Sequence, residues 1–246
     1  MSVRVIQIDH GKANALDPEF LTWFDERLSA AEADADCRAA VLTGRGAIFS
    51  AGLDLYRLLE EGPGFVEEFV PAFCAGFERL FSFPKPIVAA INGHAIAGGC
   101  VIACACDLRL MAAGGGKIGV PELRVGVPFP SIALEIVRHV VGAAHFEELI
   151  LGGATYPPHT ARDRGLIDAV VAREDLLAEA ERRAAELGTI DPESYAISKR
   201  QLRTPALERV GKSAELDREI VRVWSDSATA DRIRAYLRAT LGSDSR

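Results

Sequence analysis

The 21 residues from Pro86 to Cys106 carry no charged side chain, and this run constrains the fold strongly. Its length alone would allow one helix to cross a lipid bilayer. Asn92-Gly93 is a turn signal, however, and Gly98-Gly99 interrupts the run again. We therefore interpret the run as a buried strand, a turn and a buried helix, and we expect no membrane association.

Strand and helix patterns alternate along the chain as far as Val171. We expect strands at residues 3–10, 39–43, 86–91, 107–111 and 165–171, and helices at 17–34, 65–81, 98–106 and 131–141. The helix from Asp17 has a clear start, because an N-cap residue precedes proline and an acidic residue. Alternation with near-continuous apolar strands favours an α/β core with buried parallel strands.

After Ala172 the chain becomes charged and rich in alanine. We expect helices at residues 173–187, 191–202 and 206–241. We divide the chain into a core of residues 1–195 and a helical C-terminal region of residues 196–246. Apolar residues of this region, such as Ile220, Trp224 and Tyr236, must pack either on the core or on another subunit.

Charge and cysteine content exclude several classes of protein. A net charge of -7 argues against a nucleic-acid surface, which needs a dense basic patch. Residues 1–9 lack the pattern of a signal peptide, so we expect a cytoplasmic protein. Cys100, Cys104 and Cys106 lie in an apolar stretch, which favours reduced thiols. Neither Cys-x-x-Cys pairs nor His pairs at ligand spacing occur, so we expect no metal site.

Two glycine-containing segments could supply backbone donors to a ligand. In FSAGLDL, residues 49–55, small side chains at positions 50–52 would let a ligand approach free main-chain N–H groups. On this segment alone, an ordinary small-residue turn is the better explanation. In residues 91–100, Gly98-Gly99 stands at the start of a buried helix, whose N-terminal N–H groups suit a developing oxygen anion. The alternative is a packing role for these glycines. His94 in the same segment is a candidate base, but a turn histidine with no acidic partner in view is more often structural.

Glu122 is the acidic residue with the most unusual surroundings. It lies between Pro121 and Leu123 in a mostly apolar, glycine-containing segment. Partial desolvation there would raise its pKa and suit it to general acid/base chemistry. On this segment alone, a solvated loop glutamate is the better explanation.

Taken together, these segments resemble the crotonase (enoyl-CoA hydratase/isomerase) superfamily in order and spacing. The matching motifs are FSAGLDL, NGHAIAGG followed by CACDLR, and PELRVG, with further likeness in KANALDPEF and ARDRGLIDAVV. The likeness covers roughly residues 3–203. It implies an α/β fold, a spiral of strand-strand-helix turns, followed by a helical region used for trimerisation. A homotrimer or a dimer of trimers is the expected assembly.

The resemblance also implies a site. The backbone N–H groups of Leu53 and Gly98 would form an oxyanion hole for the thioester carbonyl of an acyl-CoA substrate. Two preorganised donors stabilise the enolate that forms when a C2 proton leaves. Ala51 and Asp54 are expected to contact substrate, and Glu122 is the expected catalytic residue. No cofactor is expected, since coenzyme A is part of the substrate.

Val101 departs from the pattern of the family's hydratases, which resemble one another in using two glutamates. Glu122 alone remains. One carboxylate can move a proton from C2 to C4, so a Δ3-Δ2-enoyl-CoA isomerase of fatty-acid oxidation is our first hypothesis. The alternatives are an enoyl-CoA hydratase that uses Asp54, Glu60 or Glu61, other enolate chemistry on a thioester, and a non-catalytic acyl-CoA-binding protein.

The phosphates of coenzyme A need local cations on an acidic protein. Lys12, Arg45, Arg57 and Lys199 are candidates, although solvated surface charge is the more ordinary role for each. Residues 55–73 are expected to shape the acyl pocket.

Overall fold

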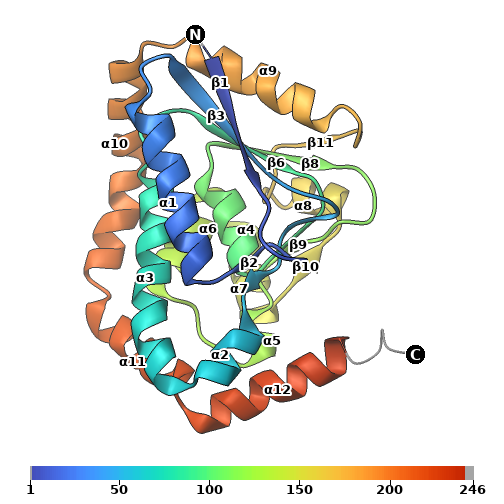
Figure 1. Ribbon diagram of the computed structural model, residues 1–246, viewed down its shortest axis with the longest axis vertical. Helices are drawn as coiled ribbons and strands as arrows, with labels where there is room; N and C mark the ends of the chain where they lie inside the picture. Colours follow the sequence, from blue (N-terminus) through green and yellow to red (C-terminus); the bar gives the residue numbers. More distant parts are fainter. Residues whose placement is uncertain (1, 242–246) are drawn as a thin grey trace.

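The computed structural model describes residues 2–241. Met1, at the start of the expected core, and residues 242–246, at the end of the expected C-terminal region, lie outside the described part. Its chain repeats turns of two or three strands followed by helix (Figure 1). The first three turns comprise β1 (Ser2–Ile8), β2 (Ala15–Leu16) and α1 (Pro18–Ala33); β3 (Cys37–Gly44), β4 (Ile48–Ser50), β5 (Gly52–Leu53), α2 (Leu55–Glu61) and α3 (Pro63–Phe81); and β6 (Ile87–Ile91), β7 (His94–Ile96) and α4 (Gly98–Ala105).

The remaining elements complete the spiral and add the helical end. They are β8 (Leu108–Ala112), β9 (Ile118–Gly119), α5 (Glu122–Val125), α6 (Ser131–Val140), α7 (Ala143–Gly152), β10 (Thr155–Tyr156), α8 (Pro158–Asp163), β11 (Ala169–Val171), α9 (Leu176–Gly188), α10 (Pro192–Gly211), α11 (Ala214–Trp224) and α12 (Ser227–Leu241). The predicted spiral with a helical C-terminal region is confirmed. The boundary expected between residues 195 and 196 falls within α10.

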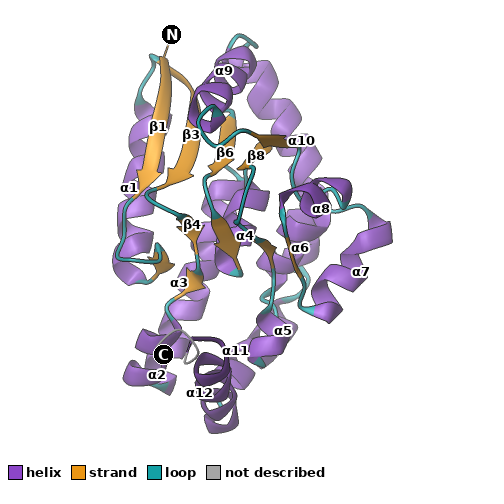
Figure 2. Cartoon of the chain, turned by 90° about the vertical axis from the view of Figure 1, so that its right-hand side faces the viewer, coloured by secondary structure: helices purple, strands orange, loops and turns teal. Residues whose placement is uncertain are grey.

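A five-stranded parallel sheet, in the order β1-β3-β6-β8-β11, forms the centre of the core (Figure 2). Neighbouring residues in its strands face opposite sides. Val41 packs with Ala180 and Ala184 of α9, whereas Leu42 belongs to the main core with α1, α3 and α4. Because both faces are covered, the central strand β6 is apolar and buried throughout, whereas the edge strand β1 keeps polar residues such as Arg4 and Gln7.

The uncharged run at residues 86–106 divides largely as expected. It forms β6, the turn at Asn92-Gly93, and α4. The structure adds β7 between the turn and the helix. Within residues 2–241, no helix combines the length and the apolar character needed to cross a membrane.

A second, smaller sheet was not predicted. Its strand order is β10-β9-β7-β4, with β4, β7 and β9 parallel and β10 antiparallel to β9. β2 and β5 form a separate parallel pair. These strands have only two or three residues each, too few to show a period of two in the sequence.

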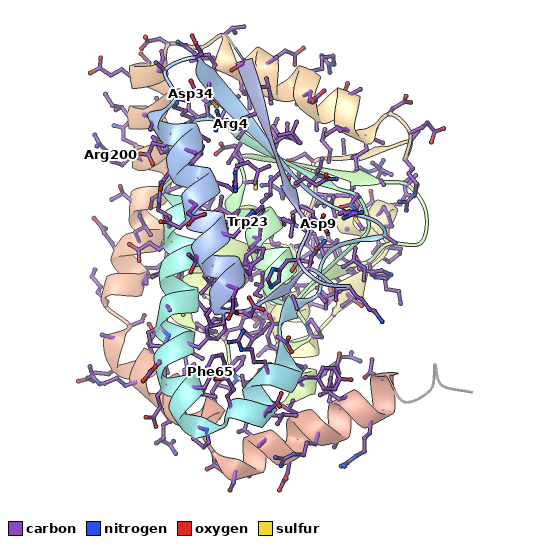
Figure 3. All side chains as sticks on the ribbon, in the orientation of Figure 1. Arg4, Asp9, Trp23, Asp34, Phe65 and Arg200 are labelled. Atoms are coloured by element: carbon purple, nitrogen blue, oxygen red, sulfur yellow. The ribbon has the colours of Figure 1, made fainter. Side chains whose placement is uncertain are left out.

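Helix α1 matches its predicted limits. Asp17 is the N-cap, and its carboxylate accepts a hydrogen bond from the backbone N–H of Phe20 at 2.7 Å. Asp34 ends the helix and accepts a bond at 2.7 Å from Arg4 of β1, beside which it lies in Figure 3.

Three expectations about the later elements were wrong. The strand expected at residues 165–171 is limited to β11, because Gly165 has a φ of +78° and Asp168 turns to accept hydrogen bonds from Arg109. The helix expected to end at residue 202 continues through Pro205 to Gly211. The helix expected from residue 206 to 241 is divided among α10, α11 and α12.

A buried ionic cluster attaches α10 to the core. Asp107 accepts hydrogen bonds from the backbone N–H of Ile87 at 2.8 Å, from Lys199 at 2.7 Å and from Arg203 at 2.6 Å. Lys199 and Arg203 are four residues apart, so they share one face of the helix. Burial lowers the pKa of Lys199 to about 8.

We predict that Asp107→Asn destabilises the protein strongly, because it leaves two buried cations without their anion. Breaking such a pair typically costs about 3–5 kcal/mol. Urea unfolding would measure the change. Glu179→Gln, which removes an exposed ion pair with Arg182 on α9, is the matched control and should leave the midpoint unchanged. Equal stability of the two variants would contradict the prediction.

Candidate active site

The small parallel sheet brings the three sequence motifs together. Ser50 of β4 pairs with Ala95 of β7, and Ala95 in turn pairs with Ile118 of β9. Since carboxyl ends of parallel strands meet at one edge of a sheet, the segments that follow them converge there. Leu53 follows β4, Gly98 follows β7, and Glu122 follows β9.

The backbone N–H of Leu53 points away from its partner strand. Leu53 pairs with Leu16, and the neighbouring N–H of Asp54 donates to the Leu16 carbonyl at 3.0 Å. In a parallel ladder a residue forms hydrogen bonds to the two residues that flank its partner. Leu16 therefore forms hydrogen bonds to residues 52 and 54 and not to Leu53 itself. Ala51 uses its own N–H on the Ala13 carbonyl at 3.0 Å. Leu53 is thus the donor that this segment leaves available.

Gly98 is the first residue of α4, where backbone N–H groups have no partner within the helix. The N–H groups of Cys100 and Val101 both turn back to the Ala97 carbonyl, at 2.9 and 3.1 Å. Ala97 itself has a φ of +55°, which is unusual for a residue with a side chain. This backbone places the Gly98 N–H at the positive end of a buried helix.

Close packing of glycines holds the two segments that carry the predicted donors beside each other. A Cβ on Gly52 would lie 2.8 Å from the Ala97 Cβ and 2.9 Å from the Gly98 nitrogen. A Cβ on Gly99 would lie 2.3 Å from the carbonyl oxygen of Ser50. The small residues of the two motifs therefore let the backbone around Gly52 lie in direct contact with the backbone around Gly98.

Glu122 is buried, with 8% of its surface exposed, and begins the short helix α5. Its Oε2 is buried and has no hydrogen-bond partner among the described residues. Desolvation raises the pKa of Glu122 to about 8, from an ordinary value of 4.5. Such a carboxyl group can both accept and hold a proton near neutral pH.

One pocket contains the predicted donors and the predicted base. Ala51, Leu53, Gly98 and Glu122 all contribute to its walls, and so does Val101. The other residues that line the pocket are Leu55, Phe73, Phe77, Ile96, Ala97, Pro121, Val125, Val127, Pro130, Ala133, Trp224 and Tyr236. Glu122 is the only acidic residue among these lining residues of the described chain.

The acids considered as a second catalytic group lie elsewhere. Asp54 is the N-cap of α2, and its Oδ1 accepts hydrogen bonds from the N–H groups of Tyr56 and Arg57 at 3.0 Å each. Glu60 is exposed, and Glu61 is exposed and bonded to Arg57 at 2.7 Å. Asp54, expected to contact substrate, therefore has a structural role as a helix cap.

Several pocket residues were missed in the sequence. Trp224 and Tyr236 come from α11 and α12 of the same chain, more than 90 residues after Glu122. Trp224 donates its indole N–H to the Pro128 carbonyl at 2.9 Å. The residues 55–73 expected to shape the pocket contribute Leu55 and Phe73. Amphipathic patterns predicted that the C-terminal helices bury apolar residues, but they do not indicate which surface is covered.

The four candidate cations differ in their surroundings. Lys199 was wrongly considered for coenzyme A, because it is buried against Asp107. Arg57 bonds to Glu19 and Glu61, and Arg45 bonds to Asp9 at 2.5 Å. Lys12 is exposed in the loop between β1 and β2.

Comparison with known proteins identifies the family of the chain. The sequence model of the family described as Enoyl-CoA hydratase/isomerase matches residues 1–236. A putative enoyl-CoA hydratase of Thermus thermophilus is 34% identical over 197 residues, which cover 79% of this chain and 77% of that protein. The mitochondrial enoyl-CoA delta isomerase 1 of Rattus norvegicus is 31% identical over 217 residues, 87% of this chain and 75% of that protein.

The crystal structure of human mitochondrial delta3-delta2-enoyl-CoA isomerase is also similar to this chain. It matches with a TM-score of 0.94 at 27% sequence identity, over 100% of this chain and 96% of that one. With the family match over nearly the whole sequence, the chain belongs to the enoyl-CoA hydratase/isomerase family.

Proposed function

We propose that this protein is a Δ3-Δ2-enoyl-CoA isomerase that works with a single carboxylate, Glu122. The observation that carries the proposal is the pocket lining, in which one buried carboxyl group, whose Oε2 has no partner among residues 2–241, lies among mostly apolar side chains. Val101 occupies the position at which the family's hydratases resemble one another in having a second glutamate. It lines the same pocket and is 1% exposed.

The proposed reaction uses the two backbone donors and the carboxylate in sequence. The thioester carbonyl oxygen accepts hydrogen bonds from Leu53 and Gly98. Glu122 takes a proton from C2, and the electrons of the C2–H bond pass into a dienolate whose oxygen the two donors stabilise. Glu122 then returns the proton to C4, so the double bond moves from C3–C4 to C2–C3.

The surroundings of Glu122 suit a proton that must be stored and returned. A carboxyl group with a pKa of about 8 holds a proton more firmly than an ordinary glutamate. Apolar neighbours such as Val101 and Phe73 leave little to hold a water molecule beside the dienolate. Hydration would need a second group to activate water, and Asp54, Glu60 and Glu61 are not in the lining. A purely binding protein would have no use for a carboxyl group held without a partner.

Glu122→Gln tests the proposal directly. We expect kcat for a 3-enoyl-CoA to fall by roughly 100-fold to 10,000-fold, because the general base is lost. The conversion would be followed by absorbance of the conjugated 2-enoyl thioester, and circular dichroism would verify folding. Glu60→Gln is the matched control and should behave like the wild type.

The same assay separates the alternatives. Purified protein would be given a 2-enoyl-CoA as well as a 3-enoyl-CoA. Full activity of folded Glu122→Gln, or efficient hydration of the 2-enoyl-CoA, would refute the one-carboxylate isomerase.

The pKa of Glu122 predicts a pH dependence. For the base to act it must be ionised, so kcat/KM should rise with pH and level off above about 8. Stability should change in the opposite direction. The folded state keeps this proton up to about pH 8, whereas the unfolded chain loses it near 4.5, so the free energy of unfolding falls between these values. Urea titrations at several pH values should show this decrease in the wild type and a smaller one in Glu122→Gln.

Gly52→Ala should separate the two donors of the proposed oxyanion hole. Gly52 has a φ of +82°, and the added methyl group would meet Ala97 and the Gly98 nitrogen at less than 3 Å. Losing one such donor typically lowers kcat by roughly 100-fold or more. Gly64→Ala, at a position with open space, is the control. Wild-type kcat in a folded Gly52→Ala protein would contradict the assigned donors.

A further inference from the structure

Helix α12 lies across the two elements that carry the site. Ile233 is fully buried in a cluster with Leu58 of α2 and Val125 of α5. Figure 1 shows α12 running past both helices. The first of these helices follows Leu53 within two residues, and the second begins at Glu122. Since Tyr236 of α12 also lines the pocket, this helix contributes to the candidate active site of the same chain.

A backbone turn holds α12 against the helix of the catalytic carboxylate. Arg232 donates from its Nε to the Gly126 carbonyl at 3.3 Å. The N–H groups of Gly126 and Val127 both donate to the Glu122 carbonyl at 3.0 Å. A side chain at Gly126 would lie 2.8 Å from the Cδ of Arg232, so the two segments pack in direct contact. Tyr236 follows Arg232 by one helical turn and reaches the pocket.

The large side chains of the pocket differ in how firmly they are held. Phe73 and Phe77 are 6% and 3% exposed, and their ring centroids lie 4.3 Å apart. Trp224 is 6% exposed and bonded to the Pro128 carbonyl. Tyr236 is only half-buried. Its ring packs on the apolar cluster that contains Leu58, Val125 and Ile233, and it is the least buried of the aromatic rings that line the pocket.

We propose that Tyr236 is a specificity-determining residue, whose ring limits the length of the acyl chain that the pocket accepts. The proposal rests on the proposed function in that the pocket is taken to hold an acyl thioester. Fixed rings of α3 and α11 form the other large walls, so the pocket can lengthen where Tyr236 stands. The native ring favours shorter acyl chains.

Substitutions at Tyr236 test this role through a ratio of substrates. For each variant, kcat/KM would be measured with 3-dodecenoyl-CoA and with 3-hexenoyl-CoA. Tyr236→Ala should raise the ratio of the first to the second more than tenfold, since each newly buried methylene gains roughly fourfold. Tyr236→Trp should lower the ratio. Tyr236→Phe, which keeps the ring, should leave it unchanged.

Leu237→Ala is the matched control. Leu237 packs on the same apolar cluster but does not line the pocket, so its truncation loosens α12 without lengthening the pocket. The ratio should stay at the wild-type value. A ratio unchanged in both Tyr236→Ala and Tyr236→Trp, with hexenoyl turnover retained, would overturn the proposal.

Calorimetry distinguishes failure of this inference from failure of the proposed function. If the wild type turned over neither substrate, the isomerase assignment would fail. Binding of saturated dodecanoyl-CoA and hexanoyl-CoA to the wild type and to Tyr236→Ala would still measure the pocket. A tenfold gain in relative affinity for the longer ligand in Tyr236→Ala supports the role of Tyr236, and no gain refutes it.

Discussion

Parallel pairing among β4, β7 and β9 determines where the residues of the site lie. These strands are short, and they keep their register because they are buried: Ser50, Ala95 and Ile118 are all fully inaccessible. The backbone N–H of Ala95 donates to the Lys117 carbonyl at 2.9 Å, and that of Ala97 donates to the Gly119 carbonyl at 2.9 Å. Each strand ends at the same edge, so Leu53, Gly98 and Glu122, which are widely separated in sequence, meet in one pocket. A shift of one residue in this register would send every following side chain to the opposite face.

Two buried carboxylates in this protein have opposite surroundings, and the contrast separates structure from chemistry. Asp107 is satisfied by Lys199, Arg203 and a backbone N–H, so it joins α10 to the core. Glu122 has an oxygen with no partner among the described residues, and desolvation raises its pKa to about 8. A paired carboxylate stabilises the fold but cannot exchange protons readily, whereas an unpaired one is available for proton transfer.

Sequence reasoning predicted the features that are local. The inner strands of the main sheet contain short apolar runs such as Ile87–Ile91, and Asp17 marks the start of α1, so these elements were placed within a few residues. The small sheet escaped because strands such as Gly52–Leu53 are too short to carry a pattern. The motif around Glu122 pointed to a role, but its burial depends on distant contacts. Trp224 and Tyr236 could not be assigned, since an amphipathic helix indicates which face is buried and not what it covers.

Two unfavourable local features, at Ala97 and Glu122, lie in the pocket. Ala97 adopts a backbone conformation that typically costs about 1–3 kcal/mol for a residue with a side chain. Its methyl group packs against Gly52, the residue before Leu53, so the same strained residue lies where the two segments of the pocket are in contact. Glu122 adds the cost of desolvation beside it. Burial of apolar side chains on both faces of the parallel sheet offsets these two costs, although the sheet lies outside the pocket. The large apolar core, fully buried at Leu42 and Ile91, is therefore what allows a strained backbone and an unpaired carboxyl group to persist together.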